Sequence, residues 1–154
     1  MYKISNINKI PGEFVDDPDF QTQMQSLLIG DALGCEKIYV NIDYVKPGGK
    51  STKYHSHSRQ EEFFLIMSGK GILRINGEEI PVETGDVISK PAGKDIAHQF
   101  INNSSTILQI LDVGNRDKDD VAVYPDENKV FLRNKRLVFD MDDNIKNWSS
   151  DPNE

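Results

Sequence analysis

The chain has 154 residues, of which 37% are hydrophobic and 28% are charged, and its formal net charge is −7. This length and composition predict one domain, residues 1–154, with a hydrophobic core of its own. The negative charge argues against nucleic acid or an anionic membrane surface as the main partner, because binding to either needs a basic surface. No apolar run approaches the length of a signal peptide or a membrane span, and Cys35 is the only cysteine. We therefore expect a cytoplasmic protein without disulfides.

Short hydrophobic runs separated by turn residues dominate the chain. Residues 37–45 alternate hydrophobic and polar positions, and Asn76-Gly77 suits a tight hairpin because both of its central residues need positive φ. The spacing of the runs and the near absence of amphipathic helix predict an all-β sandwich or barrel. The expected strands are residues 37–45, 61–67, 72–75, 79–82, 87–90, 96–101 and 106–113, followed by less distinct strands at 130–132 and 137–139 and one helical turn at 142–148.

Two of the three histidines stand in the segment HSHSRQEEFF, which begins at His55. Residues two apart on a strand share a face, so His55 and His57 can point into one cavity. Glu62 can face this cavity from the next run, and His98 begins another run after a Pro/Gly turn. One carboxylate and three imidazoles suit a divalent transition metal such as zinc, iron, manganese or nickel.

Glu61 is the alternative to Glu62 as the carboxylate ligand. Adjacent residues on a strand face opposite ways, so only one of the two can point inward. An inward Glu62 places Phe64 and Ile66 on the cavity side, and the spacing therefore favours Glu62 over Glu61.

Two segments resemble the paired motifs of the cupin family. Residues 49–69 match the first motif, G-x5-H-x-H-x4-E-x6-G, at every fixed position. Residues 85–102 resemble the second motif, G-x5-P-x-G-x2-H-x3-N, but have four residues rather than two between Gly93 and His98. A subgroup of small cupins, most of them without an assigned reaction, is similar in this insertion and in the run YPDENK at 124–129.

The resemblance implies a fold and a set of ligands. The implied fold is an all-β jelly-roll barrel, also called a double-stranded β-helix, with a core at about residues 36–114 and extensions at both ends. Gly69, Gly85 and Gly93 would serve turns. The implied ligands of one divalent metal (Mn, Fe, Zn or Ni) are His55, His57, Glu62 and His98.

Three classes of function remain open for such a barrel. The first is a metal-dependent enzyme acting on a small polar or anionic metabolite, with isomerisation of a sugar phosphate, dioxygenation or decarboxylation as the implied reactions. The second is a metal-bearing barrel that binds or senses a small molecule without turnover, and the third is a structural barrel. A cavity with Tyr, Arg or Gln aimed at the metal would favour the enzyme, whereas a purely apolar cavity would favour binding. The residues that can supply such groups, each of which can equally have a purely structural role, are Tyr39, Tyr54, Gln60, Arg74, Gln99 and Gln109.

The expected partners are a small molecule and a second copy of the chain. Cupins of this size often pair through sheet edges, so we expect a homodimer. Basic residues that bracket the two motifs are candidates for a ring of positive charge at the cavity mouth that attracts an anion. These residues are Lys53, Arg59, Lys90 and Lys94.

Overall fold

Antiparallel strands form the body of the protein, whose computed structural model describes residues 3–17 and 22–143. The larger sheet has six strands in the order β1-β2-β3-β10-β5-β8. Their bounds are β1 Gly12–Asp17, β2 Thr22–Leu28, β3 Ile38–Val45, β5 Glu62–Ser68, β8 Val87–Lys90 and β10 Leu108–Asn115. One short helix, α1 (Ile29–Leu33), connects β2 to β3. A 3-10 turn, η1 (Ile7–Lys9), precedes β1.

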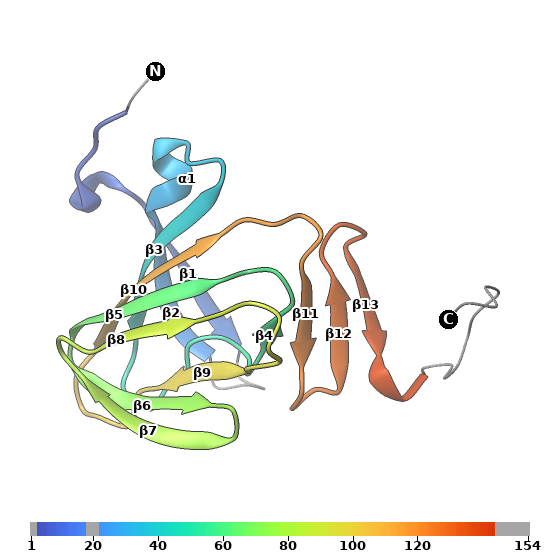
Figure 1. The fold of residues 1–154 in the computed structure, drawn as a ribbon. Coiled ribbons are helices and arrows are strands. Elements are labelled where there is room, and N and C mark those ends of the chain that lie inside the picture. Colours follow the sequence, from blue (N-terminus) through green and yellow to red (C-terminus); the bar gives the residue numbers. More distant parts are fainter. Residues whose placement is uncertain (1–2, 18–21, 144–154) are drawn as a thin grey trace, which may run out of the picture.

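A smaller sheet faces the first one across the core (Figure 1). It has three strands in the order β7-β6-β9, with bounds β6 Lys70–Ile75, β7 Glu78–Glu83 and β9 His98–Ile101. Side chains from both sheets meet between them and form one buried hydrophobic cluster. Its members are Met24, Val45, Phe64, Ile66, Leu73, Val82, Phe100, Leu108 and Ile110. These two packed antiparallel sheets confirm the predicted all-β jelly-roll fold.

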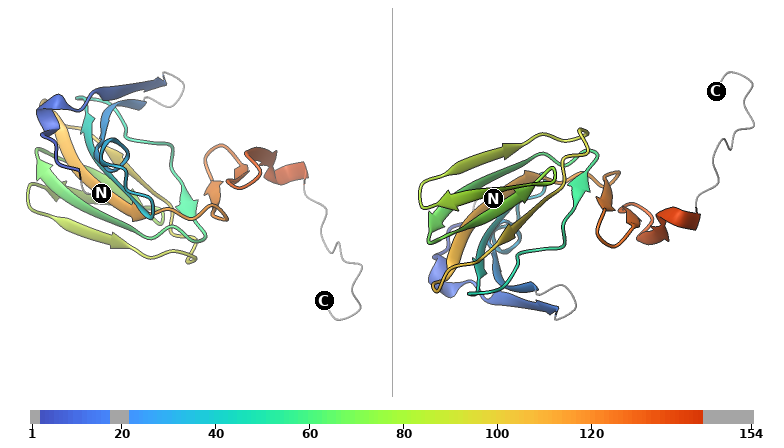
Figure 2. Two further views of the ribbon diagram at one scale, coloured as in Figure 1. Left: turned by 90° about the horizontal axis from the view of Figure 1, so that it is seen from above. Right: turned by 90° about the horizontal axis from the view of Figure 1, so that it is seen from below.

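A third sheet extends from one end of the barrel toward the C-terminus (Figure 2). Its order is β13-β12-β11-β4, with bounds β4 Ser56–His57, β11 Val121–Tyr124, β12 Lys129–Leu132 and β13 Leu137–Asp140. A 3-10 turn, η2 (Met141–Asp143), follows β13. Because β4 carries His57 and pairs with β11, this sheet connects the C-terminal segment directly to the predicted site.

Glycines occupy the turn positions that the two motifs predicted. Gly69, Gly85 and Gly93 have φ of 86°, 98° and 67°, a conformation that side chains with a Cβ rarely adopt. At Gly69 an added Cβ would also lie 2.5 Å from the carbonyl oxygen of Ile107, so the β5–β6 turn requires glycine on steric grounds as well.

The predicted strands from residue 37 to residue 113 occur in the structure as β3, β5, β6, β7, β8, β9 and β10, with ends shifted by a few residues. The strands β1, β2, β4 and β11 were not predicted, because their local patterns are short or polar. The predicted helical turn at 142–148 lies mostly outside the described residues. No helix in the described part of the chain is long and apolar enough to cross a membrane.

Candidate metal centre

A short backbone pairing brings His55 and His98 together. The His55 N–H donates to the His98 carbonyl at 3.2 Å, and the His98 N–H donates back to the His55 carbonyl at 2.9 Å. This reciprocal pair sets the two side chains next to each other, with ring centroids 4.8 Å apart. The Nδ1 of His55 also lies 2.7 Å from the carbonyl oxygen of Lys53, which leaves its Nε2 for the cavity.

Asp120 orients His57 from the C-terminal sheet. β4 pairs with β11, and the Asp120 carboxylate just before β11 lies 2.7 Å from His57 Nδ1. Asp120 is completely buried and also accepts hydrogen bonds from the backbone N–H groups of Arg59 and Gln60 at 2.9 and 3.3 Å. A carboxylate that holds Nδ1–H presents Nε2 as the free, electron-rich nitrogen of the ring.

Glu62 lies at the start of β5, where three strands meet. Its neighbours in register are Lys90 of β8 and Gly114 of β10. Lys90 Nζ lies 2.8 Å from Glu62 Oε2, and both side chains are buried. Glu62 is 4% exposed whereas Glu61 is exposed, so the side chains alternate as the strand pattern predicts.

Tyr39 reaches Glu62 across Gly114. In register, Gly114 pairs with Tyr39 of β3 on one side and with Glu62 on the other. An added Cβ at Gly114 would lie 2.5 Å from the Tyr39 ring, so the absence of a side chain at Gly114 leaves room for this ring. The Tyr39 hydroxyl lies 3.0 Å from Glu62 Oε1 and 2.9 Å from Asp112 Oδ1. Gln60 Nε2 donates to the same Glu62 oxygen at 3.2 Å.

Three of the four predicted ligands form one compact group. His55, Glu62 and His98 each offer a ligand atom within 4.8 Å of the others. His57 is not in that group, although its Nε2 lies 3.6 Å from Glu62 Oε1 and 3.3 Å from Gln60 Nε2. Two ligand atoms bound to one ion at about 2.1 Å lie roughly 3 to 4 Å apart. The distances from Glu62 to His57 (3.6 Å) and to His98 (3.7 Å) therefore suit a shared cation, whereas the widest separation of up to 4.8 Å would have to shorten when the ion binds.

The protonation states of these residues suit metal binding. Burial lowers the pKa of all three histidines and takes that of His55 to about 4, so the imidazoles are neutral at pH 7. Burial alone would raise the pKa of Glu62, but the basic groups of His98, His57 and Lys90 outweigh this effect and hold the pKa at about 2. Neutral imidazoles beside a carboxylate are the forms that metals bind.

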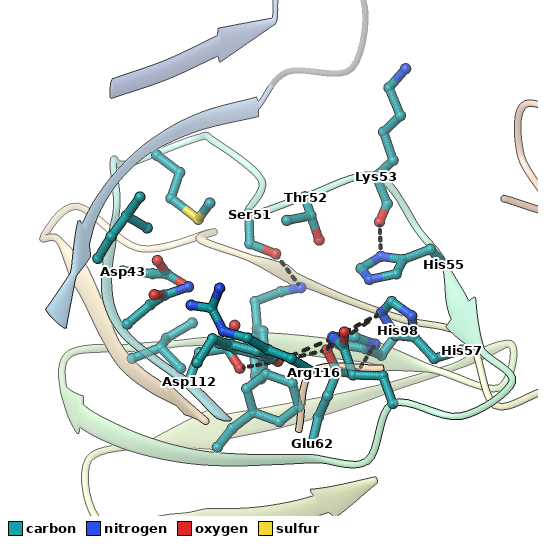
Figure 3. A pocket seen from close by; sticks show the side chains of 18 of the residues that line it. Asp43, Ser51, Thr52, Lys53, His55, His57, Glu62, His98, Asp112 and Arg116 are labelled. Atoms are coloured by element: carbon teal, nitrogen blue, oxygen red, sulfur yellow. Dashed lines mark hydrogen bonds and ion pairs between the residues drawn. The ribbon is translucent and has the colours of Figure 1, made fainter. Parts of the chain in front are cut away.

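A cavity of about 500 Å³ opens beside this group. Figure 3 shows the histidines on one side of it and Asp43 and Asp112 on the other, with Glu62 between them. Asp43 is buried and accepts a 2.5 Å hydrogen bond from the hydroxyl of Ser26. Burial raises the pKa of Asp43 to about 6, and burial together with the charges of Asp43 and Glu62 raises that of Asp112 well above its usual value.

The basic residues around the cavity are partly different from those predicted. Lys53 lines the cavity, but the prediction for Lys90 was wrong, because this side chain is 1% exposed and reaches into the barrel. Arg59 and Lys94 are exposed, and neither is among the residues that line the cavity. The mouth contains Arg116 and Arg133 instead, both with partly exposed side chains.

Sequence reasoning missed the carboxyl groups that surround the predicted ligands. Asp112 follows the apolar run Ile110-Leu111 and was an available signal for a buried polar role, whereas Asp43 stands among the polar positions of an alternating strand and gave no such signal. Asp120 stands in a run with Asp117 and Asp119, and nothing in the local sequence distinguishes the three.

Comparison with known proteins gives one family. Residues 42–114 match the cupin domain family. The oxalate-binding protein of Thermotoga maritima is 33% identical over 67 residues, which are 44% of this chain and 54% of that protein. The chain thus spans about half the length of the curated relatives that it matches.

Two solved structures match over nearly the whole chain. One is a candidate sugar phosphate isomerase from Acidithiobacillus ferrooxidans, with 29% identity, a TM-score of 0.85 and coverage of 93% of both chains. The other is a sugar phosphate isomerase of the cupin superfamily from Silicibacter pomeroyi, with 26% identity, a TM-score of 0.80 and coverage of 96% of this chain and 98% of that one. Residues 42–114 are therefore a cupin domain, and the chain is a small protein of the cupin superfamily.

Proposed function

We propose that this cupin is a metal-dependent isomerase of a sugar phosphate or of a chemically similar polyhydroxylated metabolite. The observation that carries the proposal is the hydrogen-bonded chain from Asp112 through Tyr39 to Glu62, which sets a hydroxyl donor beside the candidate metal ligands. A tyrosine and a glutamine directed at the centre are the feature expected of a catalytic rather than a purely binding cavity.

We propose His55, His57, Glu62 and His98 as the residues that hold one divalent transition metal. One buried atom of this set, His98 Nδ1, makes no hydrogen bond within the described part of the chain and lies 3.7 Å from Glu62 Oε2, as expected of an atom meant for another partner. The mixed nitrogen and oxygen donors suit Mn, Fe, Zn or Ni. When bound, such a metal polarises a carbonyl or hydroxyl oxygen of the substrate.

The residues around the centre would donate, accept and transfer protons. The Tyr39 hydroxyl has one proton and two carboxylate neighbours, so it can donate to only one of them at a time. A protonated Asp112 would donate to Tyr39 and leave the Tyr39 proton for Glu62 or for a substrate oxygen. Isomerisation moves a proton between neighbouring carbons or oxygens, and a buried chain of this kind can hold that proton away from water.

The cavity walls favour a substrate with hydroxyl groups and an anionic end. Asp43 and Asp112 are acceptors for hydroxyl groups on the wall opposite the histidines. Lys53, Arg116 and Arg133 line the cavity and are candidates to bind a phosphate, although Arg116 is paired with Asp31 and Arg133 with Asp120. The similarity to two proteins described as sugar phosphate isomerases agrees with this substrate class.

A second candidate is non-catalytic binding of a small dicarboxylate. It is favoured by the 67-residue similarity to the oxalate-binding protein of Thermotoga maritima. Asp43 opposes it, because its pKa of about 6 leaves the carboxylate ionised at pH 7 and a dianion beside that charge would be repelled. We therefore rank it below the isomerase.

The deciding experiment is a substrate screen followed by nuclear magnetic resonance. Protein loaded with Mn, Fe, Zn or Ni is incubated with aldose and ketose phosphates in deuterated water, and we expect isomer formation with deuterium incorporated at the carbon that exchanges its proton. Tyr39→Phe keeps the ring and should slow turnover at least about tenfold. Tyr44→Phe is the matched control, because Tyr44 lies on the same strand outside the cavity and accepts a hydrogen bond from Gln109. Binding of oxalate without turnover of any sugar phosphate would instead support the second candidate.

We also propose that the protein is a homodimer. β13 ends the C-terminal sheet, and its side chains Leu137, Val138 and Phe139 are 49%, 60% and 48% exposed. Three consecutive exposed hydrophobic residues on an edge strand are a liability that a second chain would cover.

A further inference from the structure

Lys90 is a fully buried basic side chain beside the candidate metal centre. Its side chain is 1% exposed, and it is the largest of the fully buried side chains. Lysine is almost never fully buried without a charged partner. The β5–β8 register sets Lys90 directly opposite Glu62, so both side chains enter the barrel together.

Glu62 is the anionic partner of Lys90. The Nζ of Lys90 lies 2.8 Å from Glu62 Oε2. The other carboxylate oxygen, Oε1, accepts from the neutral donors Tyr39 and Gln60 and lies 3.6 Å from His57 Nε2. Each oxygen of Glu62 lies near one imidazole, since His98 Nδ1 is 3.7 Å from Oε2, but only Oε2 has an ammonium beside it and only Oε1 has the two neutral donors.

This arrangement limits how Glu62 can bind a cation. A metal bound through both oxygens would compete with Lys90 for Oε2, and a buried ammonium that loses its counter-charge is strongly destabilised. Oε1 has only neutral donors to release, so it is the oxygen that is free to bind. A fixed positive charge within reach of the same carboxylate also repels an incoming divalent ion.

We propose that Lys90 is a positioning residue that keeps Glu62 a one-oxygen ligand and weakens the affinity of the centre for divalent cations. This inference rests on the metal centre of the proposed function. It goes beyond that function because it assigns a regulatory role in metal affinity to a residue that would not itself bind the metal.

The test compares metal affinity in variants that keep or remove the charge. Lys90→Met removes the ammonium and keeps most of the volume, whereas Lys90→Arg keeps the charge. Binding of Mn²⁺ is followed by electron paramagnetic resonance of the free ion, and binding of Zn²⁺ by competition with a chelating dye. We expect Lys90→Met to bind both ions at least about tenfold more tightly than the wild type, and Lys90→Arg to remain within a few-fold of it.

A matched control and a second readout separate this role from general stability. Lys70→Met removes the same charge from an exposed position on β6 and should leave the affinity unchanged. The visible absorption spectrum of bound Co²⁺ should differ between Lys90→Met and the wild type, because the second oxygen of Glu62 becomes available. If Lys90→Met does not fold without metal, Lys90→Gln, which retains a hydrogen-bond donor, takes its place.

The outcomes distinguish the inference from the proposed function. Wild-type protein that binds metal with the same affinity as Lys90→Met and Lys90→Gln would overturn the role of Lys90 and leave the metal centre intact. The failure of the wild type and of every variant to bind any of these ions would overturn both. Tight binding by the neutral variants together with weak binding by the wild type would support the inference.

Discussion

Replacing Asp120 by asparagine should weaken metal binding although Asp120 would not touch the metal. The asparagine has one acceptor oxygen instead of two, so it cannot accept from both His57 Nδ1 and the backbone N–H groups of Arg59 and Gln60. One charge-assisted hydrogen bond of a completely buried group is lost, which costs about 1.5 to 3 kcal/mol. His57 is then free to take the other tautomer, and loss of such a partner typically lowers metal affinity by about 10- to 100-fold.

Chelator competition with Zn²⁺, together with urea unfolding of the metal-free protein, measures both effects for Asp120→Asn. The matched control is Asp119→Asn, because the carboxylate of Asp119 accepts from Asn134 and is not within hydrogen-bonding distance of a predicted ligand. Metal affinity within twofold of the wild type in Asp120→Asn would refute the argument, since it would mean either that His57 does not bind the metal or that its orientation does not depend on Asp120.

Three further predictions concern the cavity and the assembly. Asp43→Asn retains an acceptor for Ser26 but removes the carboxyl group. The pKa of that group is raised to about 6 in the folded protein, against about 3.9 in the unfolded chain, so Asp43 destabilises the fold only when it is ionised. Urea unfolding of Asp43→Asn should therefore show a free energy of unfolding up to about 3 kcal/mol higher than that of the wild type at pH 8, and no difference at pH 4. An equal gain at both pH values would contradict this. Gly114→Ala would place a Cβ 2.5 Å from the Tyr39 ring, so thermal denaturation and the isomerase assay should both show losses. Val138→Asp should convert the dimer to a monomer in light scattering, and a wild type that is already monomeric at micromolar concentration would disprove the dimer.

Local patterns predicted the barrel because its strands alternate strongly and its turns contain residues suited to positive φ. The Asn76-Gly77 turn between β6 and β7 is an example, with φ of 49° and 83° at its two residues. The inward direction of Glu62 followed from the same alternation. These features depend on neighbouring residues only, which is why the sequence sufficed for them.

Other features depend on contacts between distant residues. Asp120 reaches His57 only because β4, a two-residue strand, pairs with β11 more than sixty residues later in the chain. Lys90 was expected at the surface because of its residue type, and its burial depends on the pairing of β8 with β5. Long-range register of this kind leaves no periodic signal in either partner segment.

The segment that follows the cupin domain completes the candidate site. The family match ends at residue 114, yet Asp120 fixes His57, Tyr124 stacks on His55 with ring centroids 5.7 Å apart, and Arg133 lies at the cavity mouth. The similarity to the isomerase-related structures covers at least 93% of the chain and must therefore include most of residues 115–143, whereas the similarity to the oxalate-binding protein covers 67 residues. The cavity is lined from both parts, by Asp43 and Asp112 of the barrel strands and by Tyr124 and Arg133 of the C-terminal segment, so contacts to a substrate are expected from both.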